Sequence, residues 1–146
     1  MPSSINFFSE KIKFTLKNKR KRRDWIIEIA KKEGYQVKEI NYIFCSDKYL
    51  LQINRTFLNH DYFTDIITFN NSEKKKELEA ELYISISRVK ENAKEEGVLF
   101  EEELNRVIIH GVLHLMGYKD KSRQQQELIR KKENSSLKTY KKKCST

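Results

Sequence analysis

The segment from Glu101 to Asp120 constrains the fold more than any other part of this 146-residue chain. Its apolar residues recur at helical spacing, which predicts an amphipathic helix over residues 101–116 with one face turned toward a core. Acidic residues fill the first turn, where the helix dipole favours negative charge, and Gly117 offers the left-handed conformation that ends many helices. The apolar residues are Leu104, Val107, Ile108, Val112 and Leu115. The rest of the domain must therefore supply an apolar surface on which this helix packs.

Two of the three histidines in the chain, His110 and His114, lie four positions apart on the predicted helix. Positions i and i+4 share one face of a helix, so both imidazoles can approach the same point. The turn after Gly117 can bring Asp120 back toward the two rings, which predicts one metal ion held by two nitrogens and one oxygen. Water would fill the fourth position, as is typical of catalytic sites. The alternatives are two core histidines satisfied by hydrogen bonds and a solvated Asp120.

The remaining patterns predict a small sheet flanked by helices. Alternating apolar residues predict four strands, over residues 12–16, 38–45, 65–69 and 80–86, the first of them at an edge of the sheet. Helical spacing and capping residues predict four further helices, over residues 24–34, 46–57, 87–97 and 124–137. The expected fold class is α+β, a small mixed four-stranded sheet packed against about five helices. We expect a single hydrolase domain over residues 1–137 and a basic, flexible tail over residues 138–146.

The net charge of +9 comes from 30 basic and 21 acidic residues, and the excess is concentrated in two runs. One run covers residues 17–23 and the other covers residues 138–143. Surfaces of this kind attract polyanions through phosphate neutralisation and counterion release. Beside a metal centre, this charge favours nucleic acid as the partner, with a merely solvated basic face as the alternative.

The sequence also indicates the cellular compartment. No apolar stretch approaches the length of a membrane span, and no apolar segment follows the N-terminal charges. The two cysteines, Cys45 and Cys144, are too few for a disulfide framework. We therefore expect a cytoplasmic protein with no membrane partner.

The histidine spacing is that of the zincin signature His-Glu-x-x-His, but Gly111 stands where zincins have glutamate. The general base of those metallopeptidases is therefore missing, so the sequence predicts a zincin-like metal helix without peptidase activity. Because Gly111 has no side chain, either a neighbouring element of the fold or a bulky substrate can approach the helix closely at this point.

The segment His-Gly-Val-Leu-His-Leu-Met-Gly-Tyr at residues 110–118 resembles the signature of the YbeY family of bacterial metal-dependent endoribonucleases. Asn54, the block at residues 64–69 and the block at residues 80–85 resemble further motifs of the family in the same order, so the resemblance covers about residues 38–137. It implies an endoribonuclease with one zinc ion per chain that cleaves single-stranded RNA. The implied roles are maturation of the 3′ end of 16S ribosomal RNA and ribosome quality control, with the small ribosomal subunit as partner.

Four residues depart from the family pattern: Lys119, Asp120, Leu58 and Glu81. The family's third metal ligand is a histidine, whereas this chain has Asp120, so the implied ligand set is His110, His114 and Asp120. A carboxylate is a competent zinc ligand, but its charge makes the metal a weaker Lewis acid and admits harder metals. Leu58 stands where the family has an arginine tied to its RNA activity, and Glu81 replaces an aspartate.

The resemblance places Asp65 and Glu81 on strands near the metal helix, where either would act as general base or would orient a ligand imidazole. The basic residues expected to contact RNA are Lys19, Arg20, Lys21, Arg22, Arg23 and Lys119. Two other functions stay open. One is a non-catalytic, ribosome-associated factor that keeps the metal for folding, and the other is a metal hydrolase of a non-RNA substrate, because an open metal site does not define its substrate.

Overall fold

The computed structural model describes residues 3–145. Within this range the chain forms four strands and five helices. The strands are β1 (Ser4–Glu10), β2 (Gln36–Cys45), β3 (Ile66–Asn70) and β4 (Glu77–Ser85). The helices are α1 (Lys19–Lys32), α2 (Asp47–Leu58), α3 (Ile86–Glu96), α4 (Phe100–Leu115) and α5 (Arg123–Cys144). The predicted α+β class is confirmed.

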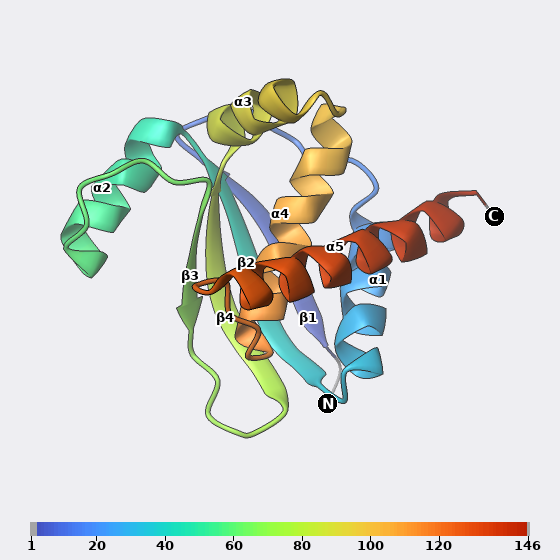
Figure 1. The fold of residues 1–146 in the computed structure, drawn as a ribbon. Helices are drawn as coiled ribbons and strands as arrows, with labels where there is room; N and C mark the ends of the chain where they lie inside the picture. Colours follow the sequence, from blue (N-terminus) through green and yellow to red (C-terminus); the bar gives the residue numbers. More distant parts are fainter. Residues whose placement is uncertain (1–2, 146) are drawn as a thin grey trace.

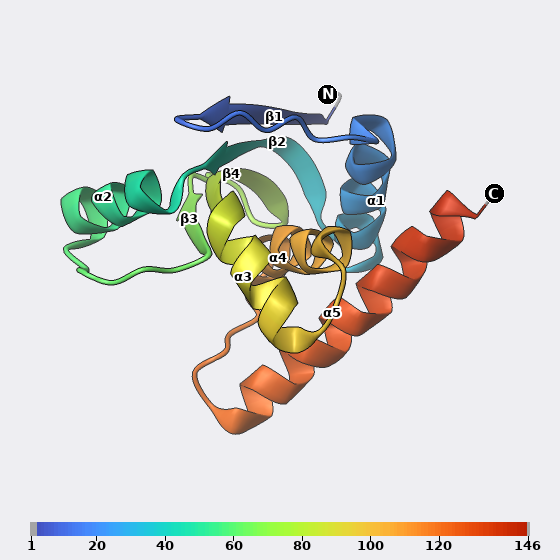
Figure 2. The same ribbon diagram turned by 90° about the horizontal axis from the view of Figure 1, so that it is seen from above.

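The strands form one sheet in the order β1-β2-β4-β3. The pairs β1–β2 and β2–β4 are parallel, whereas β3 runs antiparallel to β4, so the sheet is mixed as predicted. Helices α1, α4 and α5 lie on one side of the sheet, with α5 crossing outside α4, while α2 extends away from the body (Figures 1 and 2). Helix α4 is therefore enclosed between the sheet and α5, and this arrangement fixes the position of its histidines.

The core lies between the sheet and these helices. Leu104, Ile108 and Val112 of α4 have no exposed surface, in agreement with the predicted apolar face. Two buried aromatic residues also satisfy their polar atoms, because Tyr42 Oη donates to the Ile108 carbonyl at 3.1 Å and Trp25 Nε1 donates to the Ser136 carbonyl at 2.8 Å. These bonds tie α4 to the sheet and α5 to α1. No helix in the described part of the chain is long and apolar enough to cross a membrane.

Two predictions for the N-terminal part are wrong in their placement. The edge strand is Ser4–Glu10, not residues 12–16, although Phe14 of the latter segment still packs against Phe44 with ring centroids 5.2 Å apart. The alternating apolar residues of segment 12–16 therefore pack on the core although the segment does not pair as a strand. Helix α1 begins at Lys19 and not at Asp24, because lysine and arginine are good helix formers and the basic run itself is helical.

The predicted flexible tail is also wrong for residues 138–144, which continue helix α5 to Cys144. Tyr140 is buried, and its ring lies 5.0 Å from the ring of Trp25, measured between centroids. This contact lies three residues beyond the expected helix end at Leu137. It shows that the helix of the basic run has an apolar side that packs on α1. Thr146 lies outside the described residues. Helix α3 likewise starts slightly earlier than predicted, with Ser85 as its cap in place of Ser87.

Candidate metal centre

Helix α4 ends at Leu115, one residue after His114, and the chain then folds back. The amides of Gly117 and Tyr118 bond to the carbonyls of His114 and Leu113, both at 3.0 Å, and Gly117 has φ +98°. A residue with a side chain is strained in this conformation, so glycine permits the reversal. Gln126 Nε2 then donates to the Asp120 carbonyl at 3.0 Å and anchors the loop to the start of α5. The predicted turn toward the histidines is thereby confirmed.

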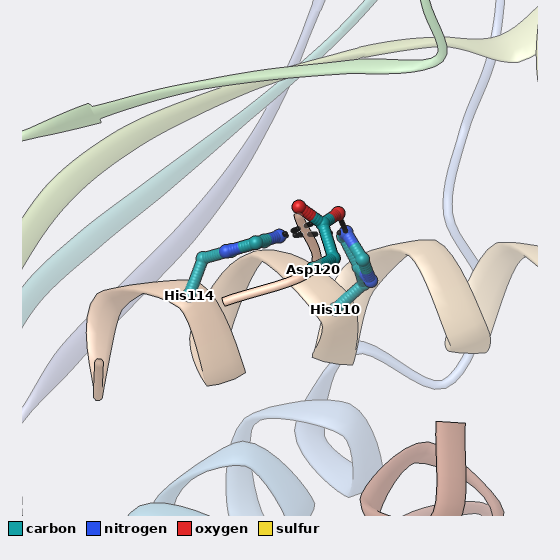
Figure 3. Close-up of side chains that lie close together, drawn as sticks. All are labelled: His110, His114 and Asp120. Carbon is teal, nitrogen blue, oxygen red and sulfur yellow. Dashed lines mark hydrogen bonds and ion pairs between the residues drawn. The ribbon is translucent and has the colours of Figure 1, made fainter. Parts of the chain in front are cut away.

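The structure brings together the three predicted ligands (Figure 3). His114 Nε2 lies 2.9 Å from His110 Nε2 and 3.3 Å from Asp120 Oδ2, and His110 Nε2 lies 3.6 Å from the same oxygen. Ligand atoms about 2.1 Å from a tetrahedral ion are separated by about 3.4 Å. The three atoms therefore have the spacing that one metal ion requires, and the residues present fit such an ion.

Glu133 of α5 orients the first of these rings. Its Oε2 lies 2.6 Å from His110 Nδ1, and its side chain is only 5% exposed. The carboxylate accepts a hydrogen bond from Nδ1–H, which leaves the Nε2 lone pair free to face His114 and Asp120. Burial by itself would lower the pKa of His110, but the hydrogen bond to Glu133 and the nearby carboxylates raise the pKa overall.

Sequence reasoning missed Glu133, although the sequence carried a signal for it. The buried residues of α5 recur at helical spacing, and Glu133 stands among Ile129, Ser136, Leu137 and Tyr140 on that face. A carboxylate on the buried face of an otherwise polar helix requires a partner. In the structure its other oxygen, Oε1, also accepts from Arg106 at 3.1 Å.

Asp65 lies just before β3, and the structure places it beside the metal centre as predicted. It lines the same cavity as His110 and Asp120, and its Oδ2 accepts from Asn92 Nδ2 at 3.1 Å. Burial raises the pKa of the Asp65 carboxyl, while the charge of His110 opposes this effect. A carboxyl group with a raised pKa is suited to accept a proton near neutral pH. Its role as general base stays a prediction.

Glu81 does not share this location. It alternates with Leu82, whose side chain lies against Gly111 of α4, so Glu81 projects from the opposite face of the sheet. Its neighbours across the strands are Asn41 and Phe69. The prediction that Glu81 is a base or orients a ligand is therefore wrong, because a residue of a strand reaches only one face.

Gly111 serves packing in this fold. A Cβ atom at this position would lie within 3.0 Å of both Leu82 Cδ2 and Ile66 Cδ1. Of the two alternatives left open by the sequence, close approach of another element is the one observed.

The basic residues predicted to contact RNA fall into two groups. Arg22 is buried, with Nε bonded to Asn105 Oδ1 at 2.9 Å and an ion pair to Glu101, and Arg23 donates to the Ile5 carbonyl at 2.7 Å. The buried guanidinium group of Arg22 joins α1 to α4, so its assignment to RNA is wrong. Arg23 is only half-buried, and its role in RNA binding stays a prediction. The remaining predicted contacts stay candidates: Lys19, Arg20, Lys21 and Lys119.

The position of α1 limits what the remaining cluster can do. Arg22 contacts Glu101 and Asn105 at the start of α4, whereas His110 and His114 lie toward the end of that helix. Lys19, Arg20 and Lys21 therefore lie away from the metal centre, and Lys119 stands directly before the ligand Asp120.

Comparison with known proteins shows to which family this chain belongs. The sequence model of the family described as "Endoribonuclease YbeY" matches residues 4–141. The chain belongs to the YbeY family. A protein of Cytophaga hutchinsonii named Endoribonuclease YbeY is 53% identical over 134 residues, covering 92% of this chain and 94% of that protein. A Karelsulcia muelleri protein of the same name is 48% identical over 139 residues, covering 95% and 97% of the two chains.

A solved structure similar to this YbeY-family chain is the solution structure of TM1509 from Thermotoga maritima. It is 31% identical, has a TM-score of 0.65, and the match covers 95% of this chain and 93% of that chain. The family predicted from the sequence is thus confirmed. The residues that carry the YbeY-like signature, 110–118, are those that build the histidine pair and the turn to Asp120.

Proposed function

We propose that this YbeY-family protein is a zinc-dependent endoribonuclease specific for single-stranded RNA. We propose ribosomal RNA in the bacterial cytoplasm as its substrate, with maturation of the 3′ end of 16S ribosomal RNA and ribosome quality control as its roles. The observation that carries the proposal is the metal-binding geometry of His110, His114 and Asp120, with His110 oriented by Glu133. The names of the relatives, Endoribonuclease YbeY, support the reaction class.

Zinc is the metal that this donor set favours. Two imidazole nitrogens and one carboxylate oxygen, with a fourth position open to water, form a typical catalytic zinc site. An oxygen ligand also suits harder ions such as Mn²⁺, so metal analysis tests this part of the proposal separately.

A bound zinc ion would lower the pKa of its water to about 7 and polarise a phosphoryl oxygen. The chain's own residues contribute orientation and proton transfer. Glu133 holds the proton on His110 Nδ1 and thereby keeps Nε2 available as a ligand. Asp65, which is half-buried and lines the adjoining cavity, accepts a proton on its carboxylate, and the exposed ammonium group of Lys119 contacts a phosphate beside Asp120.

The decisive experiment measures cleavage of a single-stranded RNA by the wild-type protein and by His114→Ala, each analysed for bound zinc. Because removing a group that merely supports a ligand costs 10–100-fold, removing the ligand itself should lower the cleavage rate by more than about 100-fold. Circular dichroism must show that the variant is folded. Cleavage at the wild-type rate by a folded His114→Ala protein would refute the metal-dependent mechanism.

The same preparations separate the two alternative functions. If the metal serves only folding, a chelator should unfold the protein. If the protein is a metal-dependent enzyme, a chelator should stop cleavage while the protein stays folded, and added zinc should restore the activity. If the protein hydrolyses another substrate, its binding constant for RNA should lack the steep dependence on salt that phosphate contacts produce. Such contacts make the logarithm of the binding constant fall linearly with the logarithm of the salt concentration.

A further inference from the structure

A cavity of about 440 Å³ opens next to the metal centre, between α3, α4 and α5. It includes His110 and Asp120, so a substrate held at the metal has direct access to it. The described residues that line it include two arginines, Arg106 and Arg130, and six carboxylates. The carboxylates are Asp65, Glu95, Glu96, Glu103, Asp120 and Glu133. This excess of negative charge repels a phosphate group, even though a metal ion beside it attracts one.

Several of these carboxylates already have partners. Glu133 bonds to His110 and Arg106, Glu96 accepts from Arg130 at 2.9 Å, and Asp65 accepts from Asn92. Their charges serve the metal centre and the packing of α5.

Glu103 is different. The residue is only 6% exposed, and its Oε1 has no hydrogen-bond partner among residues 3–145. Arg106 Nε lies 4.0 Å from Glu103 Oε1, which is too far for a hydrogen bond. A buried acceptor left without a donor costs about 1–3 kcal/mol, so a ligand that donates a hydrogen bond at this point would recover that free energy.

The remaining lining suits a flat, neutral ligand. Val107 and Ile129 are apolar and buried, and the side chains of Asn92 and Gln126 offer amide groups. Apolar surface with a few polar groups is typical of small-ligand sites. A nucleobase has apolar faces and a polar edge, and a base next to the scissile phosphate would reach this cavity from the metal centre.

We propose that the cavity binds the guanine base next to the scissile phosphate, with Glu103 accepting hydrogen bonds from its N1–H and N2–H₂ groups. This inference rests on the proposed endoribonuclease function. Guanine presents two adjacent donors on its Watson–Crick edge, which matches the two oxygens of one carboxylate. Uracil presents one donor between two carbonyl oxygens, and those oxygens face the carboxylate unfavourably. Since a bidentate contact to a base discriminates by about 1–3 kcal/mol, cleavage beside guanine should exceed cleavage beside uracil by about 5- to 150-fold.

The test uses metal-loaded protein and oligouridine substrates that contain a single guanosine, inosine or 7-deazaguanosine. The wild-type protein should cleave beside guanosine and 7-deazaguanosine about equally. It should cleave beside inosine, which lacks the 2-amino group, several-fold more slowly. Glu103→Gln should lose the preference for guanosine by about 10-fold and cleave the all-uridine substrate within about 3-fold of the wild-type rate, while the matched surface variant Glu127→Gln retains the preference. Equal cleavage beside guanosine and uridine, or a preference that Glu103→Gln leaves intact, would overturn the assignment.

A second measurement separates this inference from the proposed function. Guanosine and uridine are titrated into the wild-type protein and Glu103→Gln while the methyl resonances of Val107 and Ile129 are followed by NMR. Guanosine should shift these resonances in the wild-type protein at concentrations where uridine does not, and Glu103→Gln should abolish the difference. If RNA is not cleaved and guanosine still binds, the nuclease function fails and the cavity assignment stands. If guanosine causes no shift, the cavity assignment fails whatever the protein cleaves.

Discussion

Replacing Glu133 with glutamine tests whether α5 is part of the metal centre. In the structure the Glu133 carboxylate lies 2.6 Å from His110 Nδ1 and is almost fully buried. Glutamine preserves the shape and can still accept from Nδ1–H, but it removes the negative charge that strengthens His110 as a ligand. Alanine removes both the charge and the hydrogen bond, so the two variants separate electrostatic support from orientation.

The magnitude follows from the role of Glu133 beside a ligand. Loss of a carboxylate that supports a ligand histidine weakens metal binding by about 10–100-fold, or about 1.4–2.7 kcal/mol. We expect Glu133→Gln near the lower end of that range, because the hydrogen bond persists, and Glu133→Ala at the upper end or beyond. Both variants also leave Arg106 and Arg130 without a charged partner that lies 3.1 and 3.6 Å away, so stability must be measured independently.

Zinc affinity can be measured by competition with a chromophoric chelator at pH 7.5. Circular dichroism should confirm that each protein is folded. Glu127→Gln is the matched control, since it removes the same charge from an exposed position of α5. If folded Glu133→Gln and Glu133→Ala both bind zinc within about 2-fold of the wild-type affinity, the proposed support of His110 by Glu133 is refuted.

Three further predictions concern stability. Arg22→Ala should lower the free energy of unfolding, measured in urea, by about 3 kcal/mol because it leaves Asn105 without its donor. The control Arg20→Ala removes an exposed arginine and should change this free energy by less than about 0.5 kcal/mol. Equal effects of the two variants would contradict the distinction between the buried and the exposed arginine. Gly111→Ala gains about 1 kcal/mol of helix propensity but overpacks α4 against the sheet at a cost of about 1–3 kcal/mol. Calorimetry should therefore show a lower Tm for this variant. A higher Tm would disprove the packing argument. Burial raises the pKa of Glu103 from 4.5 to about 7, so the folded state binds more protons at this group than the unfolded state between these values. The contribution of Glu103 to stability should therefore fall by up to about 3 kcal/mol as pH rises from 4.5 to 7. Glu103→Gln should flatten that dependence in metal-free protein, and an unchanged slope would show that Glu103 is not its source.

The parts of the fold that local chemistry determines were predictable from the sequence. Apolar spacing placed α4 to within one residue at each end, and Ser46 caps α2 as predicted, accepting from the Tyr49 amide. The i, i+4 rule brought the two imidazoles together, and Gly117 marked the reversal toward Asp120. Each of these features depends on residues within a few positions of one another.

The features that the sequence did not reveal depend on distant contacts. Strand β1 pairs with β2 across the whole of α1, so the alternation at residues 12–16 could not distinguish a strand from an irregular segment packed on the core. Glu81 was placed on the wrong face because a strand pattern shows alternation without showing which face meets the helix. Arg22 belonged to a basic run by sequence, but its buried position is set by Asn105, which is 83 residues away along the chain.

Helix α5 connects these observations. It supplies Glu133 to the metal centre, and its own position depends on contacts with α1 on the far side of the helix layer. Glu133 reaches His110 from a helix whose next turn is held by Trp25, through the hydrogen bond to the Ser136 carbonyl and the ring contact with Tyr140. Trp25 belongs to α1, the helix whose basic first turn the sequence assigned to RNA binding. The basic runs at both ends of the chain therefore lie on helices that pack together, and their buried faces hold the carboxylate that supports a ligand. The geometry of the metal centre is thus a property of the whole domain and not of the histidine signature alone.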